Sequence, residues 1–430
     1  MNKFSNIFGQ ILQIFSRNEF YRAVKETEAE KGAKGFTCWQ QFVGMLFCQL
    51  GQAHSLREIC GGLASCMGKV KHLGLHASPN RSTLSYANEH RPWQLYQKIF
   101  YQLLGKCQGM GVRKKFRFRN KLFSLDATLI ELCVSLFDWA KYRTTKGAVK
   151  LHLLLDHDGY LPVFAHVTEG RVHEVNIAKG LQFPAGSIVV MDRGYVDYEM
   201  FSLWASEGVY FVTRLKDNAD FSVIEEHPVP ERRNIIRDQT IRLEGFYSRQ
   251  KYPDHLRRIE VWDADNEQVI VLLTNHLSFG PTTIAAIYKD RWQIEIFFKT
   301  LKQNLKIKTF VGTSPNALLI QIWTALIAIL ILKYLKFRST FGWSLSNLVA
   351  MLRYNLFAYR DLWAWINNPF EASPSLCAGD GTTYTSGHLI WTARDQTKDN
   401  LILKIRLNSS KRSIRQGTIY DFSLSWTAVY

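Results

Sequence analysis

The stretch that most constrains the fold is residues 286–308, AIYKDRWQIEIFFKTLKQNLKIK. Wound as an α-helix at ~100° per residue, it places four chemically distinct side chains within a stripe about 60° wide. These residues are Tyr288, Arg291, Glu295 and Lys302. An apolar stripe lies beside them, and Lys299 and Lys306 flank the glutamate on its other side. The pattern predicts an amphipathic helix that presents one carboxylate in a basic row at the edge of a buried seam.

Two interpretations of this helix are open from its own residues. A surface helix whose glutamate is paired with lysines for solubility would show the same pattern. A catalytic helix would need further polar groups, brought to Glu295 by other parts of the chain.

The overall charge of the chain points to a polyanionic partner. Its 430 residues include 54 Lys and Arg against 37 Asp and Glu, a formal net charge of +17. Such an excess is typical of nucleic-acid binders. A membrane surface is the weaker alternative, because the basic residues are spread along the chain. The hydrophobic fraction of 47% excludes a mainly disordered protein.

The cysteines and the apolar segments predict a cytoplasmic protein without a membrane partner. Seven cysteines without a CxxC pair indicate neither a disulfide framework nor a zinc site. The N-terminus lacks the features of a signal peptide. The run 318–332 falls short of the ~20 residues that span a bilayer and includes Gln321 and Thr324. We expect a helix buried in a large domain, with membrane association as an alternative that high-salt washing would test.

Residues 1–112 have a helical pattern. A short helix, a turn and a longer helix in this region are compatible with a helix-turn-helix DNA reader, although a plain helical bundle would look similar. The side chains expected to be exposed there are Arg81, Ser85, Asn88 and Arg91. The run RKKFRFRNK, residues 113–121, follows as a basic linker suited to phosphate contact or as a solvated hinge.

The rest of the chain divides into a mixed α/β domain and a tail. From residue 113 to 371, strand patterns alternate with helices as in a mixed α/β sheet with helices on its faces. Residues of about 216–266 break this rhythm and predict a β-rich insertion, and about 317–367 is helical again. The tail, 372–430, is rich in small polar residues at its start, and we expect it to be poorly structured and dispensable.

Two aspartates stand where α/β sheets place chemistry. Asp126 lies in a predicted strand, on the face opposite Phe123 and Leu125. Asp192 follows the apolar run 188–191, at the carboxyl end of a buried strand, where such sheets place their active-site groups. Asp126 could instead pair with a nearby Lys or Arg, and Asp192 could cap the next turn.

Two strand aspartates and one helix glutamate provide three hard oxygen ligands. Asp126, Asp192 and Glu295 together would suit two Mg²⁺ ions held ~3.5–4 Å apart, with a phosphodiester as the substrate that the charge excess implies. Arg291 and Lys302 would then lie beside the scissile phosphate, and Tyr288 could bond to it.

These motifs resemble those of insertion-sequence DDE transposases of the IS-four family. Tyr288-x2-Arg291-x3-Glu295-x6-Lys302 is similar to the family's Tyr-Arg-Glu-Lys signature. FSLDATLIELC around Asp126 and VVMDRGYVDYEMF around Asp192 are similar to its two aspartate motifs. The similarity runs from the N-terminal helices to about residue 370, and the tail matches nothing in the family pattern.

The resemblance implies a fold and an activity. The fold is an α/β ribonuclease-H-like catalytic core with a β-rich insertion, preceded by an all-α DNA-binding domain. The activity is binding of terminal inverted repeats, cleavage of the element ends with two Mg²⁺ ions, for which Mn²⁺ substitutes, and joining of the 3′-hydroxyls to target DNA. The partners are double-stranded DNA and a second copy of the chain in a synaptic homodimer, at the bacterial nucleoid.

The resemblance also implies roles for single residues. Asp126, Asp192 and Glu295 are the metal ligands and catalytic residues, and a flipped base would stack on Trp292 or Trp262. The side chains expected to contact DNA are Tyr288, Arg291, Lys302, Trp292, Lys299, Lys306 and Arg193. Two rival functions stay open: a non-catalytic DNA-binding relic or regulator, and a stand-alone ribonuclease-H-like nuclease.

Overall fold

The fold was analysed in a computed structural model that describes residues 5–66, 69–110, 114–133, 135–143, 146–305 and 310–370. The chain divides into two units, Met1–Ser373 and Pro374–Tyr430, and every described residue belongs to the first. The predicted tail and Lys306 therefore lie outside the described residues.

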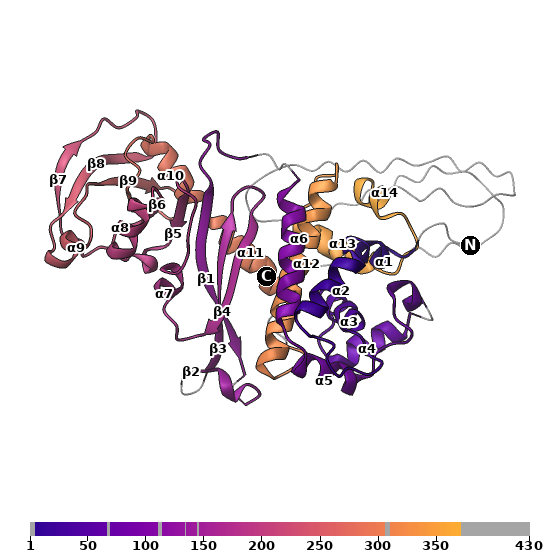
Figure 1. Cartoon of the computed structure of the whole chain (residues 1–430). Helices are drawn as coiled ribbons and strands as arrows, with labels where there is room; N and C mark the ends of the chain where they lie inside the picture. The colour runs from indigo at the N-terminus through magenta and orange to yellow at the C-terminus, as the bar shows by residue number, and fades with distance from the viewer. Residues whose placement is uncertain are drawn as a thin grey trace, which may run out of the picture. The chain divides into compact units, whose positions relative to one another are not determined.

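The centre of the described unit is a mixed sheet (Figure 1). Its antiparallel part consists of β1 (Leu122–Leu132), β3 (Lys146–Asp156) and β4 (Leu161–Glu169). On the other side of β1 follow two parallel strands, β5 (Ile188–Met191) and β6 (Tyr210–Arg214). The order across this part is β4-β3-β1-β5-β6. The mixed α/β architecture predicted from the sequence is confirmed.

The same sheet continues beyond β6 through antiparallel strands. β10 pairs with β6 and β9, and β8 joins β9 to β7. A short strand, β2, pairs with β3 at the opposite edge, and α9 lies between β8 and β9 in the chain. Their bounds are β2 Lys141–Arg143, β7 Phe221–Glu226, β8 Ile235–Leu243, α9 Phe246–Lys251, β9 Leu256–Asp263 and β10 Gln268–Thr274. Strands β7 to β9 thus fall within residues 216–266, where the sequence predicts a β-rich insertion.

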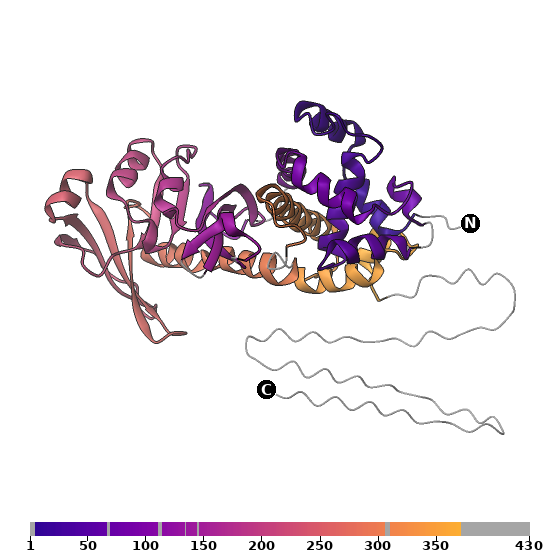
Figure 2. The same ribbon diagram turned by 90° about the horizontal axis from the view of Figure 1, so that it is seen from below.

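Helices cover both faces of the sheet because β1 and β5 are apolar on both sides. Phe123, Leu125 and Val189 pack in one core with α7 (Glu174–Ala178) and α8 (Tyr198–Ser206). Leu122, Ile188 and Val190 point the other way and pack against α10 (Pro281–Asp290). The next helix, α11 (Trp292–Asn304), contacts β1 and then α13, so that α10 and α11 follow one another along this face (Figure 2).

The predicted single helix of residues 286–308 is instead two helices with a junction at Arg291. The Arg291 amide donates to Tyr288 O over 3.1 Å, and the Ile294 amide donates to Arg291 O over 3.0 Å. Both bonds span three residues and not four, so the chain tightens to a 3₁₀ turn at this point. The prediction of one continuous helix was wrong because a wheel of side chains carries no information on such a local tightening.

The N-terminal and C-terminal helices share one hydrophobic core. Helix α12 (Pro315–Arg338) contacts α3, α5, α6 and α13, which surround it (Figure 1). The amides of Ile7 and Phe8 also donate to Ala358 O and Leu356 O. The helices that contact α12 are α3 Cys38–Leu50, α5 Arg81–His90, α6 Gln94–Gln108 and α13 Leu345–Asn355. The remaining helices of the N-terminal and C-terminal parts are α1 Ile7–Leu12, α2 Arg17–Glu26, α4 Leu56–Ala64 and α14 Leu362–Asn367. Three 3₁₀ turns of the unit are η1 Lys69–Leu73, η2 Asp138–Ala140 and η3 Arg193–Tyr195.

Helix α12 is longer than the apolar run that predicts it. It has 24 residues, begins at the cap residue Ser314, and is long and apolar enough to cross a membrane by length and composition alone. Most of it is buried inside the protein, including Gln321 and Thr324. The structure therefore shows a core helix in this position.

The predicted row of exposed side chains along α5 is only partly present. Arg81 and Ser85 are exposed, but Asn88 is buried, and its Oδ1 accepts a hydrogen bond of 2.9 Å from Gln41 Nε2. Arg91 is half-buried and donates to Gln41 over 3.3 Å. The exposure predicted for Asn88 was wrong because α3 and α12 cover that face of the helix.

Lys333 provides a test of this core. Its side chain lies within α12, is 6% exposed, and donates from Nζ to Gly159 O over 3.0 Å. Burial, assisted by the charge of Lys336, lowers the pKa of Lys333 to about 7. The folded protein therefore binds this proton less tightly than the unfolded chain, whose lysines titrate near 10.4.

We predict that Lys333→Met changes stability in a pH-dependent way. Below pH 7 both states of the wild type are protonated at Lys333 and the full cost of burying the charge is present, whereas above pH 7 only the unfolded state keeps the proton. The free energy of unfolding of the wild type should thus rise relative to the variant by about 2 kcal/mol from pH 7 to pH 9. Urea unfolding of both proteins at the two pH values measures this, and a difference independent of pH would contradict it.

Candidate active site

The sheet register brings the two aspartates together. Leu125 of β1 pairs with Met191 of β5 in parallel, so that Asp126 and Asp192 are the next residues along neighbouring strands. Asp126 lies on the face of β1 that carries Leu122, opposite Phe123 and Leu125. This is the face that the sequence predicts for it. β5 ends at Met191, and the 3₁₀ turn Arg193–Tyr195 then leads the chain away from the sheet.

Glu295 reaches the same place from the helix layer, and an arginine lies between it and Asp126. Arg291 Nη1 is 3.1 Å from Asp126 Oδ2 and 3.4 Å from Glu295 Oε1. Asp126 therefore pairs with an arginine, the alternative left open from its sequence. Asp192 precedes its 3₁₀ turn without a side-chain capping bond, so its carboxylate does not serve as a cap.

The carboxylates influence one another electrostatically. Burial raises the pKa of Asp126 to about 7, and the negative charges of Glu295 and Asp192 act in the same direction. Arg291 and the amide of Ala127, which donates to Asp126 Oδ1 over 2.8 Å, oppose this shift. A raised pKa from burial and like charges is typical of a site that gathers acidic groups for a purpose other than stability.

The donor set fits a hard divalent cation in its chemistry but not in its present geometry. Carboxylate oxygens are the ligands that Mg²⁺ prefers. Among the residues that the structure describes, however, no group of three or more His, Cys, Asp and Glu side chains lies close enough to hold an ion. The guanidinium of Arg291 lies between Asp126 and Glu295, so its positive charge would compete with a cation for these two carboxylates.

Arg291 also has a donor to spare. Its Nε is buried and bonds to no described group, while its guanidinium carbon is 5.7 Å from the centre of the Tyr288 ring. Tyr288 is half-buried between the helix and the sheet. Burial raises the pKa of Tyr288, so that its hydroxyl stays protonated and can donate a hydrogen bond.

The other predicted DNA contacts differ in how they lie. Trp292 is 61% exposed at the first turn of α11, and Lys299 is exposed further along the same helix. Lys302 is half-buried on α11. Arg193 is turned away toward Asp217, with Nη1 2.9 Å from Oδ2. The structure thus brings Tyr288 and Arg291 to the carboxylates and directs Arg193 elsewhere.

Tyr195 belongs to the site and was missed from the sequence. Its side chain is buried, and its Oη has no hydrogen-bond partner among the described residues. Burial raises the pKa of Tyr195 well above its usual value, and the charges of Asp126, Glu174 and Asp192 add to the shift. Its position three residues after Asp192 was the available signal, since a 3₁₀ turn returns the third residue to the same side.

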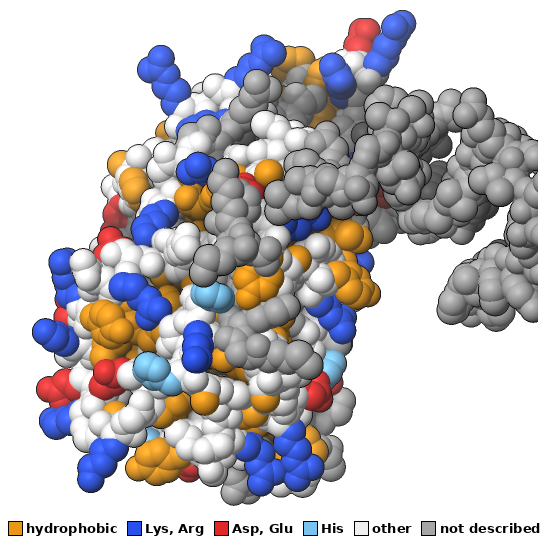
Figure 3. Space-filling model, turned by 90° about the vertical axis from the view of Figure 1, so that its right-hand side faces the viewer, with side chains coloured by type: hydrophobic (Ala, Val, Ile, Leu, Met, Phe, Trp, Pro, Cys, Tyr) orange, Lys and Arg blue, Asp and Glu red, His pale blue; other side chains and the backbone are white. Residues whose placement is uncertain are grey.

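Basic side chains are spread over the face of the N-terminal helices and do not gather in one patch (Figure 3). This distribution agrees with the even spread of Lys and Arg in the sequence. On this face, therefore, no surface stands out by charge as the predicted DNA reader.

Two family models match the chain. A model described as the transposase DDE domain matches residues 117–331, which include both aspartates and Glu295. A model described as a domain of unknown function matches residues 4–76. The match of the first model covers half of the chain.

Proteins that are named as transposases are similar to this chain in sequence. A protein of Sinorhizobium fredii, named as a transposase, is 31% identical over 323 residues, 74% of this chain and 89% of its own length. A protein of Geobacillus stearothermophilus, named as a transposase for an insertion sequence element, is 27% identical over 258 residues, 59% of this chain and 67% of its own.

One solved structure is similar in outline. A piggyBac transposase synaptic complex with hairpin DNA has a TM-score of 0.41 and 11% identity, covering 87% of this chain and 84% of that one. That likeness is weak, and the sequence matches carry the assignment. The match over residues 117–331 and the identity to the Sinorhizobium protein show that this chain belongs to the DDE transposases.

Proposed function

We propose that this chain is a DNA transposase that binds the terminal inverted repeats of an insertion sequence, cuts the element ends and joins the 3′-hydroxyls to target DNA. The observation that carries the proposal is that Arg291 contacts both Asp126 and Glu295, while Asp192 follows Met191, the register partner of Leu125, at the end of β5. An acidic cluster in a protein with a net charge of +17 is where a polyanion and a counter-cation would both be required.

The strand order supports a ribonuclease-H-like core. Three antiparallel strands, β4-β3-β1, are followed by the two parallel strands β5 and β6. The first aspartate lies on the first strand, the second at the end of the next parallel strand, and the glutamate on a later helix. The family resemblance leads us to expect this arrangement.

We further propose that the carboxylates hold two Mg²⁺ ions when DNA is bound. Asp126, Asp192 and Glu295 would hold them, and divalent cations would supply Lewis-acid stabilisation of the charge that develops on the phosphate oxygens. Because Arg291 lies between two of these carboxylates in the DNA-free protein, we expect it to move toward the phosphate when the substrate arrives.

The protein's own groups would position the scissile phosphate. Arg291 can offer its unpartnered Nε–H together with an Nη–H to two phosphate oxygens, the bidentate geometry that guanidinium groups favour. Tyr288 can donate from its protonated hydroxyl. Lys302, Lys299 and the exposed ring of Trp292 lie along α11, where the flanking strand would pass.

The setting of the reaction is proposed from the family resemblance. Two copies of the chain would act as a homodimer that holds both element ends. The N-terminal helices would contact the terminal repeats, and the protein would work in the bacterial cytoplasm at the nucleoid. Attack by water and then by a DNA hydroxyl would invert the configuration at phosphorus without a covalent enzyme intermediate.

We predict that Glu295→Ala abolishes strand cleavage without abolishing DNA binding. Loss of a group that stabilises transition-state charge should lower the cleavage rate by at least about a hundredfold. Cleavage of a labelled duplex carrying the element's end is measured with Mg²⁺ and with EDTA, alongside a gel-shift measurement of affinity.

Glu207→Gln is the control for this experiment, because Glu207 is an exposed acid at the end of α8, away from the cluster. It should cleave like the wild type. Tight end-binding without cleavage by any of the proteins would favour the regulator or relic, and cleavage of any duplex regardless of sequence would favour the stand-alone nuclease.

We predict that Arg291→Gln binds Mn²⁺ more tightly than the wild type when no DNA is present, by several-fold, because the variant removes the cation that competes for Asp126 and Glu295. Electron paramagnetic resonance titration of free Mn²⁺ measures this. Arg171→Gln, which loses an exposed arginine paired with Glu169, should leave the affinity unchanged. Equal Mn²⁺ affinity in all three proteins would show that Arg291 does not occupy the cation site.

A further inference from the structure

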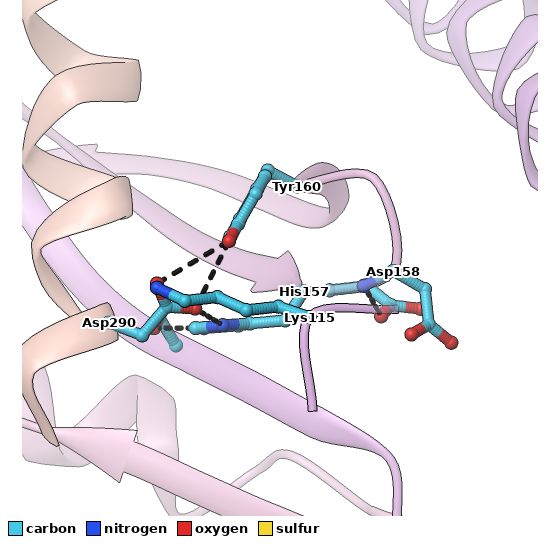
Figure 4. A network of polar contacts seen from close by, with 7 residues as sticks. Lys115, His157, Asp158, Tyr160 and Asp290 are labelled. Atoms are coloured by element: carbon cyan, nitrogen blue, oxygen red, sulfur yellow. Dashed lines mark hydrogen bonds and ion pairs between the residues drawn. The ribbon is translucent and has the colours of Figure 1, made fainter. Parts of the chain in front are cut away.

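A second buried polar cluster lies directly beside the carboxylate site and has no part in the chemistry proposed above. Its centre is Asp290, the last residue of α10, whose side chain is 1% exposed. Lys115, His157 and Tyr160 converge on it from the linker and from the β3–β4 turn (Figure 4). Three segments that are distant in the chain therefore meet at one carboxylate.

Short hydrogen bonds hold the cluster. Lys115 Nζ is 2.5 Å from Asp290 Oδ1, and His157 Nδ1 is 2.7 Å from Asp290 Oδ2. The hydroxyl of Tyr160 donates to Oδ2 over 3.2 Å. Burial alone would raise the pKa of Asp290, but the hydrogen bonds from His157 and Lys115 outweigh it, and the pKa is lowered.

His157 connects Asp290 to the central strand β1. Its Nε2 is 2.6 Å from Ser124 Oγ, and both side chains are buried. With partners at both ring nitrogens, the imidazole has one fixed orientation. Ser124, His157 and Asp290 thus form a continuous bridge from β1 to the end of α10.

This bridge runs beside the contact between Asp126 and Arg291. Ser124 and Asp126 are two residues apart on β1, so their side chains point to the same face of the sheet. Asp290 and Arg291 are consecutive residues at the junction of α10 and α11. The same strand is therefore tied to the same junction twice, once through His157 and once through Arg291.

Two side-chain contacts at consecutive residues restrict the orientation of the junction more than one contact would. A single contact would restrain the junction in one direction only, whereas bonds that leave consecutive residues about 100–120° apart oppose its rotation about the helix axis. Glu295 lies one turn further along α11, so its direction depends on the rotation of the junction. Buried ion pairs add little to stability on balance, and fixing a unique arrangement is their best-supported use.

We propose that Asp290 is a positioning residue, which acts through His157 and Ser124 to hold the α10–α11 junction so that Arg291 and Glu295 face Asp126. The inference rests on the proposed transposase function for its effect on rate, but not for its effect on structure. Lys115, whose side chain is 57% exposed, also connects this cluster to the basic linker expected to contact phosphates.

The test compares Asp290→Asn with a matched variant, Asp238→Asn. Asp238 is also a fully buried carboxylate, held by Arg257 at 2.7 and 2.6 Å, but its arginine binds Leu277 O and Phe279 O ahead of the start of α10 and not the junction at its end. We expect Asp290→Asn to lower the cleavage rate at saturating DNA and Mg²⁺ by about ten- to hundredfold, as is usual for groups that orient catalytic ligands. Its affinity for the element end should change by less than about threefold.

Tyr160→Phe is a milder variant that keeps the ring and removes only the hydroxyl that donates to the two carboxylate oxygens of Asp290. It should fold like the wild type and lower the same rate by a few-fold. A wild-type rate in Asp290→Asn would overturn the proposal. The proposal would also be overturned if the rate of Asp290→Asn fell only in proportion to its loss of folded protein, and if Tyr160→Phe and Asp238→Asn showed the same cleavage rate per folded molecule.

Amide hydrogen exchange separates this inference from the proposed function. Asp290→Asn should speed exchange at residues 291–295, whereas Asp238→Asn should do so around β8, β9 and the segment 277–279 that Arg257 binds. If the wild type cleaves no DNA, the transposase proposal fails, and the exchange measurement still decides whether Asp290 holds the junction. Unchanged amide exchange rates at residues 291–295 would contradict the positioning role.

Discussion

The arrangement of the site depends on two opposite charges that are adjacent in the chain, one buried and the other half-buried. Asp290 and Arg291 lie at the junction of two helices against the sheet, and each needs a counter-charge because an unpaired buried ion is very costly. Asp290 is paired with Lys115 and also accepts a hydrogen bond from His157, and Arg291 is paired with Asp126 and Glu295. These requirements fix where α11 begins and how it is rotated against β1.

A cluster of acidic groups around one arginine has consequences for the state of the protein before it meets DNA. Burial raises the pKa of Asp126, and the charge of Glu295 adds to that shift, so without the guanidinium the two carboxylates would repel each other inside a partly dehydrated site. The arginine therefore makes the acidic site compatible with a folded protein. Because the same positive charge also attracts a phosphate, we expect the guanidinium to move when substrate binds.

Much of this could be predicted from the sequence, and the limits have physical causes. Asp126 and Asp192 were placed correctly on their strands because alternation and strand ends follow from backbone geometry. The break at Arg291 and the burial of Asn88 could not be predicted, since both depend on contacts with distant segments. His157 and Asp290 were overlooked for the same reason, as their partners lie far away in the chain, whereas Tyr195 could have been found from its spacing to Asp192.

The bonds from the first helix to the last segments of the described unit bear on how the chain is made. The amides of Ile7 and Phe8 are satisfied by carbonyls of Ala358 and Leu356, and α12 fills the centre of the N-terminal helices. During synthesis the N-terminal helices emerge from the ribosome long before these partners exist. A nascent or prematurely terminated chain must therefore keep its N-terminal apolar surface unburied, so the part expected to read DNA matures only after the catalytic part has been translated.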